Sequence, residues 1–216
     1  MKNYGLCIVA LAGVLLFPPV LPLGNRCVSA AELVTQTTGY DSLFGFGRQS
    51  IGISGGHGLA LPIGGTSGEG LRDVQFIYLS PRWGIGISDP MGENSWFRGN
   101  FDLIVEGTFL YSFEPKDGIA GGITPLVRYN FLTDTRLIPF VQVGAGLLAL
   151  DFGLKRHADG LNFTLQGGVG IHYFIWDRAA LTGEWRFHHL SNADRHRRNA
   201  GINSSVLLFG VTGFLR

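Results

Sequence analysis

Apolar and polar residues alternate along most of this chain, in segments separated by short runs rich in Gly, Pro, Asp and Asn. The clearest segment is NFDLIVEGTFLYSF, residues 100–113, in which every second position from Phe101 to Phe113 is aromatic, aliphatic or glycine. The intervening positions include Asp102 and Glu106. Successive side chains of a β-strand point to opposite faces, so this pattern predicts a strand with one apolar face and one mixed face.

The same alternation predicts eight strands. We expect them near residues 48–61, 72–87, 97–113, 119–131, 137–150, 161–176, 180–192 and 203–216. Most are longer than strands of soluble sheets, as a tilted membrane crossing of about 9–11 residues requires. An even number of antiparallel strands can close without free edges. The pattern therefore predicts an all-β fold, an eight-stranded antiparallel transmembrane β-barrel of the outer membrane.

The composition also favours extended strands. The chain has 33 Gly and 16 Phe among 216 residues, and glycine is at about twice its usual share. No apolar stretch after the amino-terminal segment reaches about 20 residues, so we expect no transmembrane helix. The net charge of +1 gives no indication of nucleic-acid binding. A soluble barrel with its apolar face inward is the alternative to a membrane barrel.

The amino-terminal segment predicts export. Lys2 precedes an apolar run, residues 6–17, which is too short to span a bilayer and is followed by prolines. Small residues at 28–30 offer a cleavage site. We therefore expect residues 1–31 to be a cleaved signal peptide and residues 32–216 to form a single β-barrel domain. Cleavage there would remove both cysteines of the chain and leave a mature protein without disulfides.

Aromatic residues suggest the topology of the barrel. If the mature chain begins in the periplasm, every odd-numbered strand runs outward, and three aromatic groups lie at the periplasmic strand ends, where an interfacial girdle belongs. These groups are Trp96 with Phe97, Tyr129 with Phe131, and Tyr173 and Phe174 with Trp176. Inside the barrel, we expect Glu106, Arg128 and Glu184 to form ion pairs.

Charge is densest in WRFHHLSNADRHRRNAGINSS, residues 185–205. The side chains of Trp185, His189 and Ser191 share one face of the predicted seventh strand, and this is the lipid face at the outer rim. Polar groups are costly there, which favours a functional role. The two-residue spacing puts an imidazole within reach of a hydroxyl, as activation of a nucleophile by a general base requires. Asn192 and the adjoining loop could donate hydrogen bonds to an oxyanion.

At these residues the sequence resembles the PagL-type lipid A deacylases, also described as acyloxyacyl hydrolases. The resemblance is carried by HLSNA followed by NAGIN, and it extends to EWRFHHLSNA, TPLVRYNFL and PFVQVGAGLLALDF. It implies an eight-stranded outer-membrane barrel that removes an ester-linked acyl chain from lipid A, the lipopolysaccharide anchor in the outer leaflet, without a cofactor. By this resemblance His189 is the general base, Ser191 the nucleophile and Asn192 an oxyanion-hole residue.

One position departs from the family pattern. In the family an acidic residue follows the Gly–Ile pair and orients the histidine, whereas this chain has Asn203. An amide accepts a hydrogen bond from an imidazole N–H but cannot stabilise an imidazolium by charge, and Cys–His–Asn sites show that such an orienter works. Asp194 in the following loop is the alternative acid. Glu184 is expected to face the lumen instead.

Basic residues cluster in two predicted outer loops. Arg195, Arg197 and Arg198 lie in one, and Lys155 and Arg156 lie in the other, with His157 as a further member. Guanidinium groups bind phosphates bidentately, so the five cations are candidates for binding the phosphates of lipid A. A solvated loop is the alternative interpretation.

Two further alternatives concern the class of function. The histidines of residues 185–205 match no recognised metal-ligand spacing, so we expect no metal site. A non-enzymatic structural or adhesion barrel is the alternative to the hydrolase. The lipid-facing pair of His189 and Ser191 distinguishes the two, because a structural barrel has no use for it.

Overall fold

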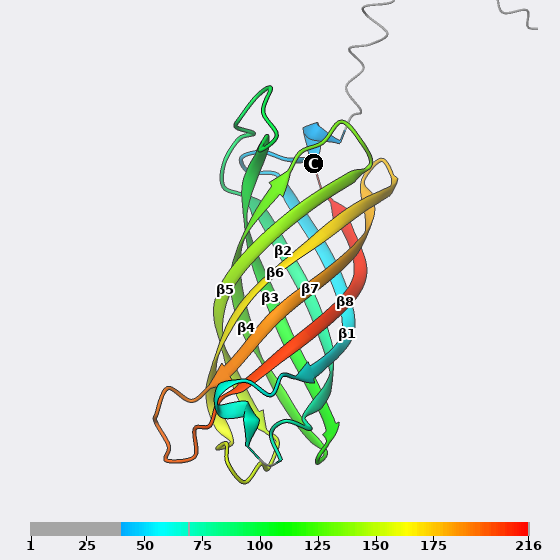
Figure 1. The fold of residues 1–216 in the computed structure, drawn as a ribbon. Coiled ribbons are helices and arrows are strands. Elements are labelled where there is room, and N and C mark those ends of the chain that lie inside the picture. Colours follow the sequence, from blue (N-terminus) through cyan, green and yellow to red (C-terminus); the bar gives the residue numbers. More distant parts are fainter. Residues whose placement is uncertain (1–39, 69, 216) are drawn as a thin grey trace, which may run out of the picture. The chain divides into compact units, whose positions relative to one another are not determined.

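A computed structural model describes residues 40–68 and 70–215. Eight antiparallel strands form a closed barrel in chain order (Figure 1). The strands are β1 (Gln49–Ala60), β2 (Gln75–Gly86), β3 (Gly99–Glu114), β4 (Gly118–Phe131), β5 (Leu137–Asp151), β6 (Gly160–Trp176), β7 (Ala179–Ser191) and β8 (Ile202–Phe214). The predicted eight-stranded barrel is therefore confirmed, with strand bounds close to those expected from the alternation.

Two short 3-10 helices, η1 (Asp41–Leu43) and η2 (Gly64–Ser67), are separate from the eight strands: η1 precedes β1, and η2 follows β1. Within the described part of the chain, no helix has the length and apolar character of a membrane-spanning helix. The predicted signal peptide, residues 1–31, and the start of the barrel domain at residue 32 lie outside the described residues and stay predictions.

Four connections lie at the end of the barrel opposite the C-terminus, and we call this end the loop end (Figure 1). They are the β1–β2 loop (61–74), the β3–β4 hairpin (115–117), the β5–β6 loop (152–159) and the β7–β8 loop (192–201). The η2 helix belongs to the β1–β2 loop. Because β1 pairs with β8, the first and last of these loops are neighbours on the barrel rim.

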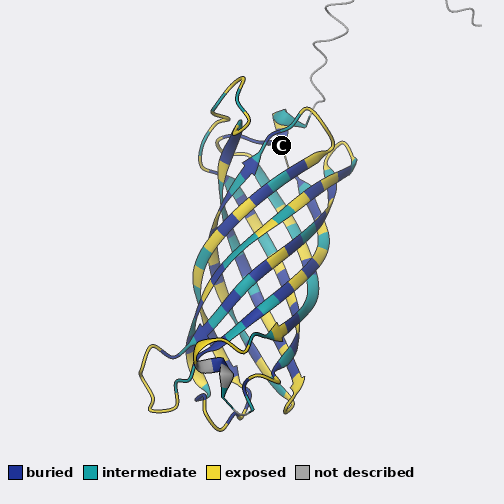
Figure 2. Ribbon diagram, in the orientation of Figure 1, coloured by how far each residue is buried: buried dark blue, intermediate teal, exposed yellow. Residues whose placement is uncertain are grey.

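Burial alternates along the strands, as Figure 2 shows in bands of buried and exposed residues. On β7, for example, Trp185 is 46% exposed, whereas Arg186 is fully buried. Outward positions on the strands carry mostly apolar side chains, whereas the inward positions combine apolar residues with many polar and charged ones such as Glu106, Glu184 and Arg186, which is the pattern of a membrane barrel and not of a soluble one. The apolar face that was predicted to meet lipid is therefore on the outside, and the alternative with an apolar interior is wrong.

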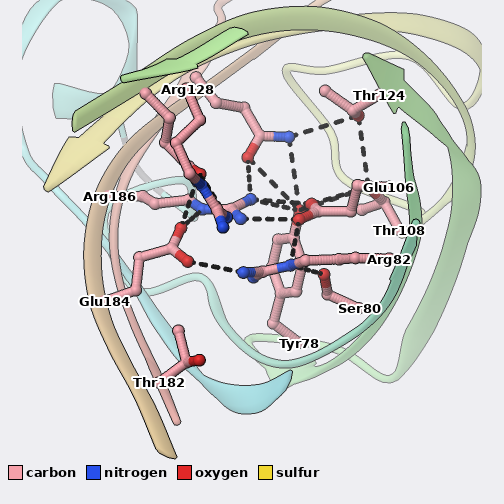
Figure 3. A network of polar contacts seen from close by, with 12 residues as sticks. Tyr78, Ser80, Arg82, Glu106, Thr108, Thr124, Arg128, Thr182, Glu184 and Arg186 are labelled. Carbon is pink, nitrogen blue, oxygen red and sulfur yellow. Dashed lines mark hydrogen bonds and ion pairs between the residues drawn. The ribbon is translucent and has the colours of Figure 1, made fainter. Parts of the chain in front are cut away.

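The lumen is filled by a ring of two arginines and two glutamates (Figure 3). Glu106 Oε2 lies 2.9 Å from Arg82 Nε and 2.6 Å from Arg186 Nη2. Glu184 closes the ring, 2.8 Å from Arg82 Nη1 and paired with Arg186 Nε. Each charge faces two opposite charges, which offsets the cost of removing four ions from water. The predicted participation of both glutamates in lumen ion pairs is confirmed.

Arg128 was also expected to form an ion pair, and this expectation is wrong among the described residues. Its guanidinium donates to Gln142 Oε1 at 2.8 and 3.0 Å and lies 4.1 Å from the centre of the Phe140 ring. Its cross-strand partner Asp102 instead accepts hydrogen bonds from Asn100 and Asn130. The alternation predicts which face of the strand a residue occupies. It does not predict which lumen side chains lie at the same height and contact one another.

The end of the barrel near the C-terminus is closed by a buried apolar cluster. Its members are Leu43, Phe44, Leu132, Ile138, Phe174, Ala180 and Phe214. Phe174 was expected in the aromatic girdle, and this expectation is wrong, because Phe174 occupies an inward-facing position of β6 and is buried in the cluster. A register shift between Phe174 and Trp176 turns Trp176 outward, where it is 70% exposed. Trp96, at 86% exposed, also projects at this end.

Candidate active site

His189 and Ser191 lie on the outer face at the end of β7, next to the loop end. Both are half-buried, whereas their neighbours His188 and Leu190 are fully buried inside the barrel. Alternate residues of a strand lie about 6.6 Å apart, so the two side chains are adjacent on one face. Among the described residues, no hydrogen bond joins the Ser191 hydroxyl to the imidazole. Hydrogen bonds between catalytic groups are often long without substrate and shorten in the complex.

Asn203 of β8 is the cross-strand partner of His189. Its Oδ1 lies 2.7 Å from His189 Nδ1, and its Nδ2 donates to the carbonyl of Ile63 at 3.0 Å. A backbone carbonyl only accepts, so the Ile63 contact fixes the orientation of the amide. Oδ1 must then accept, and the proton of the neutral imidazole must sit on Nδ1. The lone pair of Nε2 is left free, which is the tautomer that a general base needs.

The β1–β2 loop holds Asn203 through its backbone as well. The Thr66 hydroxyl accepts from the Asn203 N–H at 2.7 Å and donates to the Gly201 carbonyl at 3.3 Å. The Leu61 N–H donates to the Asn203 carbonyl at 2.7 Å. Thr66 is fully buried, so water does not compete for these bonds. No sequence pattern indicated Thr66 or Ile63, because both belong to a Gly-rich connection more than 130 residues from Asn203.

Gly201, which precedes Ile202 and Asn203, has two reasons to be glycine. Its φ of +68° lies in the left-handed region that favours glycine. A Cβ at this position would also lie 3.3 Å from His189 Cε1, closer than most Cβ contacts. The residue therefore lets the β7–β8 loop pass close to the imidazole.

Asn192 follows the serine and turns into the barrel mouth, where it is fully buried. Its backbone N–H donates to Asn199 Oδ1 at 2.9 Å, and its Nδ2 donates to the Arg198 carbonyl at 2.9 Å. The backbone donor is thus engaged within the loop. The buried side-chain oxygen Oδ1 of Asn192 has no hydrogen-bond partner among the described residues.

A tight turn follows Asn192. The Arg195 N–H donates to the Asn192 carbonyl at 3.1 Å, and the residues between, Ala193 and Asp194, have φ values of +52° and +59°. Two positive φ values in succession define a type I′ turn, which costs non-glycine residues about 1–2 kcal/mol each. The exposed Asp194 carboxylate accepts from Asn199 Nδ2 at 2.9 Å. The structure thus brings Asn203, and not Asp194, to the imidazole.

The five predicted phosphate-binding cations are all exposed on two loops. The loops are joined by backbone hydrogen bonds from Ala158 N to the Arg198 carbonyl at 2.9 Å and from Ala200 N to the Arg156 carbonyl at 3.2 Å. Arg198 also donates through Nη1 to the Leu154 carbonyl at 3.1 Å. The β5–β6 and β7–β8 loops therefore form one continuous surface with basic side chains on both parts.

His157 does not belong to this basic surface, although its sequence position suggested that it would. It is fully buried, and its Nε2 lies 2.7 Å from Asn162 Oδ1. Burial lowers the pKa of His157 below its usual value, so the imidazole is neutral at pH 7. His188 and His189 point to opposite sides of the barrel wall. No group of three His, Cys, Asp or Glu side chains in the described ranges is placed to hold a metal ion.

The fold places the protein in the class of outer-membrane β-barrels, with a histidine and a serine half-buried on the outer face at the rim. Residues 71–212 match the family model described as lipid A 3-O-deacylase (PagL). The match covers more than half of the chain, and the chain belongs to the PagL family of lipid A 3-O-deacylases. No curated protein matches it in sequence.

Solved structures agree with the fold. The outer membrane enzyme PagL is 20% identical, with a TM-score of 0.57, and the match covers 74% of this chain and 97% of that chain. Neisserial surface protein A is 16% identical, with a TM-score of 0.51 and coverage of 76% and 96%. At these identities the two structures establish the architecture alone.

Proposed function

We propose that this protein is a lipid A deacylase that hydrolyses an ester-linked acyl chain of lipopolysaccharide, with Ser191 as nucleophile and His189 as general base. The observation that carries the proposal is the contact between His189 Nδ1 and Asn203 Oδ1 at 2.7 Å. It leaves Nε2 unprotonated on the face that holds Ser191. Family membership supports the substrate class.

The reaction would run in two halves. Ser191 Oγ attacks the ester carbonyl of the acyl chain while its proton passes to His189 Nε2. The tetrahedral intermediate collapses to an acyl-serine as the protonated imidazole gives its proton to the departing sugar hydroxyl. A water molecule, deprotonated by the same nitrogen, then attacks the acyl-serine; the second tetrahedral intermediate collapses, the imidazolium returns the proton to Ser191 Oγ, and the fatty acid is released. Every proton is carried by His189, and no cofactor is required.

Asn203 takes the place of the family's acidic residue in this scheme. It can hold the imidazole in one orientation and one tautomer, but it supplies no negative charge when the imidazolium forms. Part of the transition-state stabilisation available to a carboxylate is therefore absent. Asp194 would have to leave its hydrogen bond with Asn199 to supply that charge, so Asn203 is the orienter we propose.

Two further roles complete the proposal. Following the family resemblance, we assign Asn192 to the oxyanion. Because Asn192 is fully buried and its Nδ2 donates to the Arg198 carbonyl, this role requires the amide to leave that bond and turn toward the outer face when substrate binds. Arg195, Arg197 and Arg198, together with Lys155 and Arg156, are proposed to bind the phosphates of lipid A. On the predicted topology the loop end faces the cell exterior, so both roles would be exercised at the outer leaflet.

The test is a comparison of Ser191→Ala and His189→Gln with the parent protein in cells whose lipid A is analysed by mass spectrometry. Both variants should retain a folded barrel that shifts in electrophoresis on heating, and both should leave lipid A fully acylated. Ser205→Ala is the matched control, because Ser205 lies on the same outer face and bonds to Trp185 Nε1. It should deacylate normally. Full deacylation by Ser191→Ala would refute the assignment, and fully acylated lipid A in cells with the folded parent would favour a structural barrel.

A further inference from the structure

A cavity of about 430 Å³ opens at the loop end, apart from the outer-face site. The β1–β2 loop, the β3–β4 hairpin and the β5–β6 loop all contribute to it. Its lining residues are Gly70, Leu71, Pro115, Lys116, Gly153, Leu154, Lys155 and Arg156. Leu71 and Leu154 are buried and form an apolar floor. The charged members of the lining are all cations.

These three cations, Lys116, Lys155 and Arg156, have no ion pair within the described ranges. Two acids close to them in the sequence, Asp159 and Asp117, are engaged in other contacts. Asp159 Oδ1 accepts from the backbone N–H of Gly153 at 2.9 Å, and Asp117 Oδ1 accepts from the Tyr111 hydroxyl at 2.9 Å. Three unpaired positive charges around one concave surface raise the local concentration of anions.

Two of the cations, Lys116 and Arg156, lie close to glycine residues of the neighbouring loops. Gly153, with a φ of +61°, lies beneath Lys116, and a Cβ there would overlap the ammonium group. A Cβ on Gly68 would likewise overlap the Arg156 guanidinium. Both charged groups thus lie over glycine backbone, in space that a side chain at Gly153 or Gly68 would otherwise take.

We propose that this cavity binds a phosphate group in the headgroup of the glycolipid substrate, with Lys116, Lys155 and Arg156 as ligands. The inference rests on the proposed function, since it supposes a phosphorylated lipid as substrate. A phosphate monoester carries up to two negative charges and three acceptor oxygens, which two lysines and one guanidinium satisfy. Lys116 lies on the β3–β4 hairpin, outside both of the basic loops found in the sequence.

The cavity is linked to the loop that carries Asn192. The backbone bonds between Arg156 and Ala200 and between Ala158 and Arg198 join the two loops. Arg195 and Arg197 do not line the cavity. The basic residues therefore divide into those that line the cavity and those on the open surface, and we expect the cavity, where three cations surround one concave space, to contribute more to phosphate binding than the open surface.

The experiment measures binding without turnover, in the Ser191→Ala background in detergent, by native mass spectrometry. The probes are bisphosphorylated lipid A and the same lipid with both phosphates removed. The parent should prefer the bisphosphorylated lipid. Lys116→Gln, Lys155→Gln and Arg156→Gln should each weaken that binding about three- to fivefold, as expected for exposed charge pairs, and the triple variant on the order of 50-fold.

Three controls sharpen the result. Arg72→Gln removes a cation of the β1–β2 loop that pairs with Asp73 outside the cavity, and it should leave binding unchanged. Lys116→Arg should restore binding. Gly68→Ala displaces the Arg156 guanidinium from its position without removing its charge, so it should weaken binding less than Arg156→Gln does.

Several outcomes would overturn the inference. These are equal binding of both lipids by the parent, or a triple variant that keeps the preference for phosphate. Competition by inorganic phosphate alone at concentrations similar to the lipid would mean that the cavity takes the free ion rather than a headgroup. Failure of the proposed function is separate: a Ser191-containing protein that binds the phosphorylated lipid but releases no fatty acid would refute the deacylase and leave the cavity assignment intact.

Discussion

The two faces of β7 carry polar groups for different purposes. On the inner face, Glu184 and Arg186 belong to a ring in which each charge has two opposite partners. On the outer face, His189 has one nitrogen bonded and the other free, and the Ser191 hydroxyl has no partner among the described residues. The inner charged groups are paired within the protein, whereas on the outer face one imidazole nitrogen and the serine hydroxyl remain available to a ligand.

Lack of a partner does not by itself indicate function. The neighbouring His188 is fully buried in the lumen, and both of its ring nitrogens lack a partner within the described residues. It is packed against the rings of Phe76 and Tyr78, and no substrate can reach it from the membrane. The difference between His188 and His189 is access: only His189 combines a free nitrogen, a fixed tautomer and a half-buried hydroxyl, that of Ser191, on the same outer face.

The largest effect is expected from breaking the inner ring. Glu106→Gln removes the carboxylate between Arg82 and Arg186 and should lower the free energy of unfolding by about 3–5 kcal/mol, because two buried cations lose a counter-charge. The kcat of the folded fraction should change little. Urea unfolding in detergent measures the first quantity, and fatty-acid release per folded molecule measures the second. The exposed Glu114→Gln is the control, and equal stability of the two variants would show that the ring is not stabilising.

Changes on the outer face should lower kcat and have little effect on the free energy of unfolding. Asn203→Ala removes the orienter of His189 and should lower kcat about 10- to 100-fold, the value of one hydrogen bond to a group that becomes charged. The free energy of unfolding should change much less than it does in Glu106→Gln. Asn203→Glu should keep or raise kcat, since a carboxylate stabilises the imidazolium, although it loses the bond to the Ile63 carbonyl. Initial rates on purified lipid A measure each kcat.

Asp194→Asn tests the rival assignment within the same assay. Because Asp194 bonds to Asn199 and not to the imidazole, this change should be nearly silent. If it abolishes activity while both Asn203 variants are silent, Asp194 is the acid and the tautomer argument fails.

A smaller effect is expected from the β1–β2 loop. Thr66→Val keeps the shape of the side chain but removes both hydrogen bonds of its hydroxyl, to Asn203 N and the Gly201 carbonyl. The orientation of Asn203 should loosen, lowering kcat about three- to tenfold with KM unchanged. Thr66→Ser should restore kcat. A rise in KM without a change in kcat would instead place Thr66 in substrate binding.

The smallest effects are expected on the open basic surface. Arg195→Gln, Arg197→Gln and Arg198→Gln should each raise KM about twofold and leave kcat unchanged, because exposed cations contribute little individually. The increase should shrink at high salt, where exposed charges are screened. Steady-state rates at two ionic strengths measure this, and KM values equal to the parent at low salt would show that the loop is only a solvated surface.

The alternation of residues by itself determined the strands, their faces and the shared outer position of His189 and Ser191. These are local properties, since a strand repeats every two residues whatever it pairs with. The sequence motif around Ser191 could likewise be recognised from the sequence, and so could the replacement of the family's acidic residue by Asn203.

Only the tertiary structure decided which groups meet. Barrel stagger sets the heights of side chains in the lumen, so it gave Glu106 the partners Arg82 and Arg186 and left Arg128 with Gln142. Loop conformation brought Thr66 and Ile63 into hydrogen bonds with Asn203, and Lys116 and Arg156 to the lining of one cavity, across long stretches of chain. Such contacts depend on closure of β1 against β8 and on backbone bonds between loops, neither of which leaves a periodic trace in the sequence.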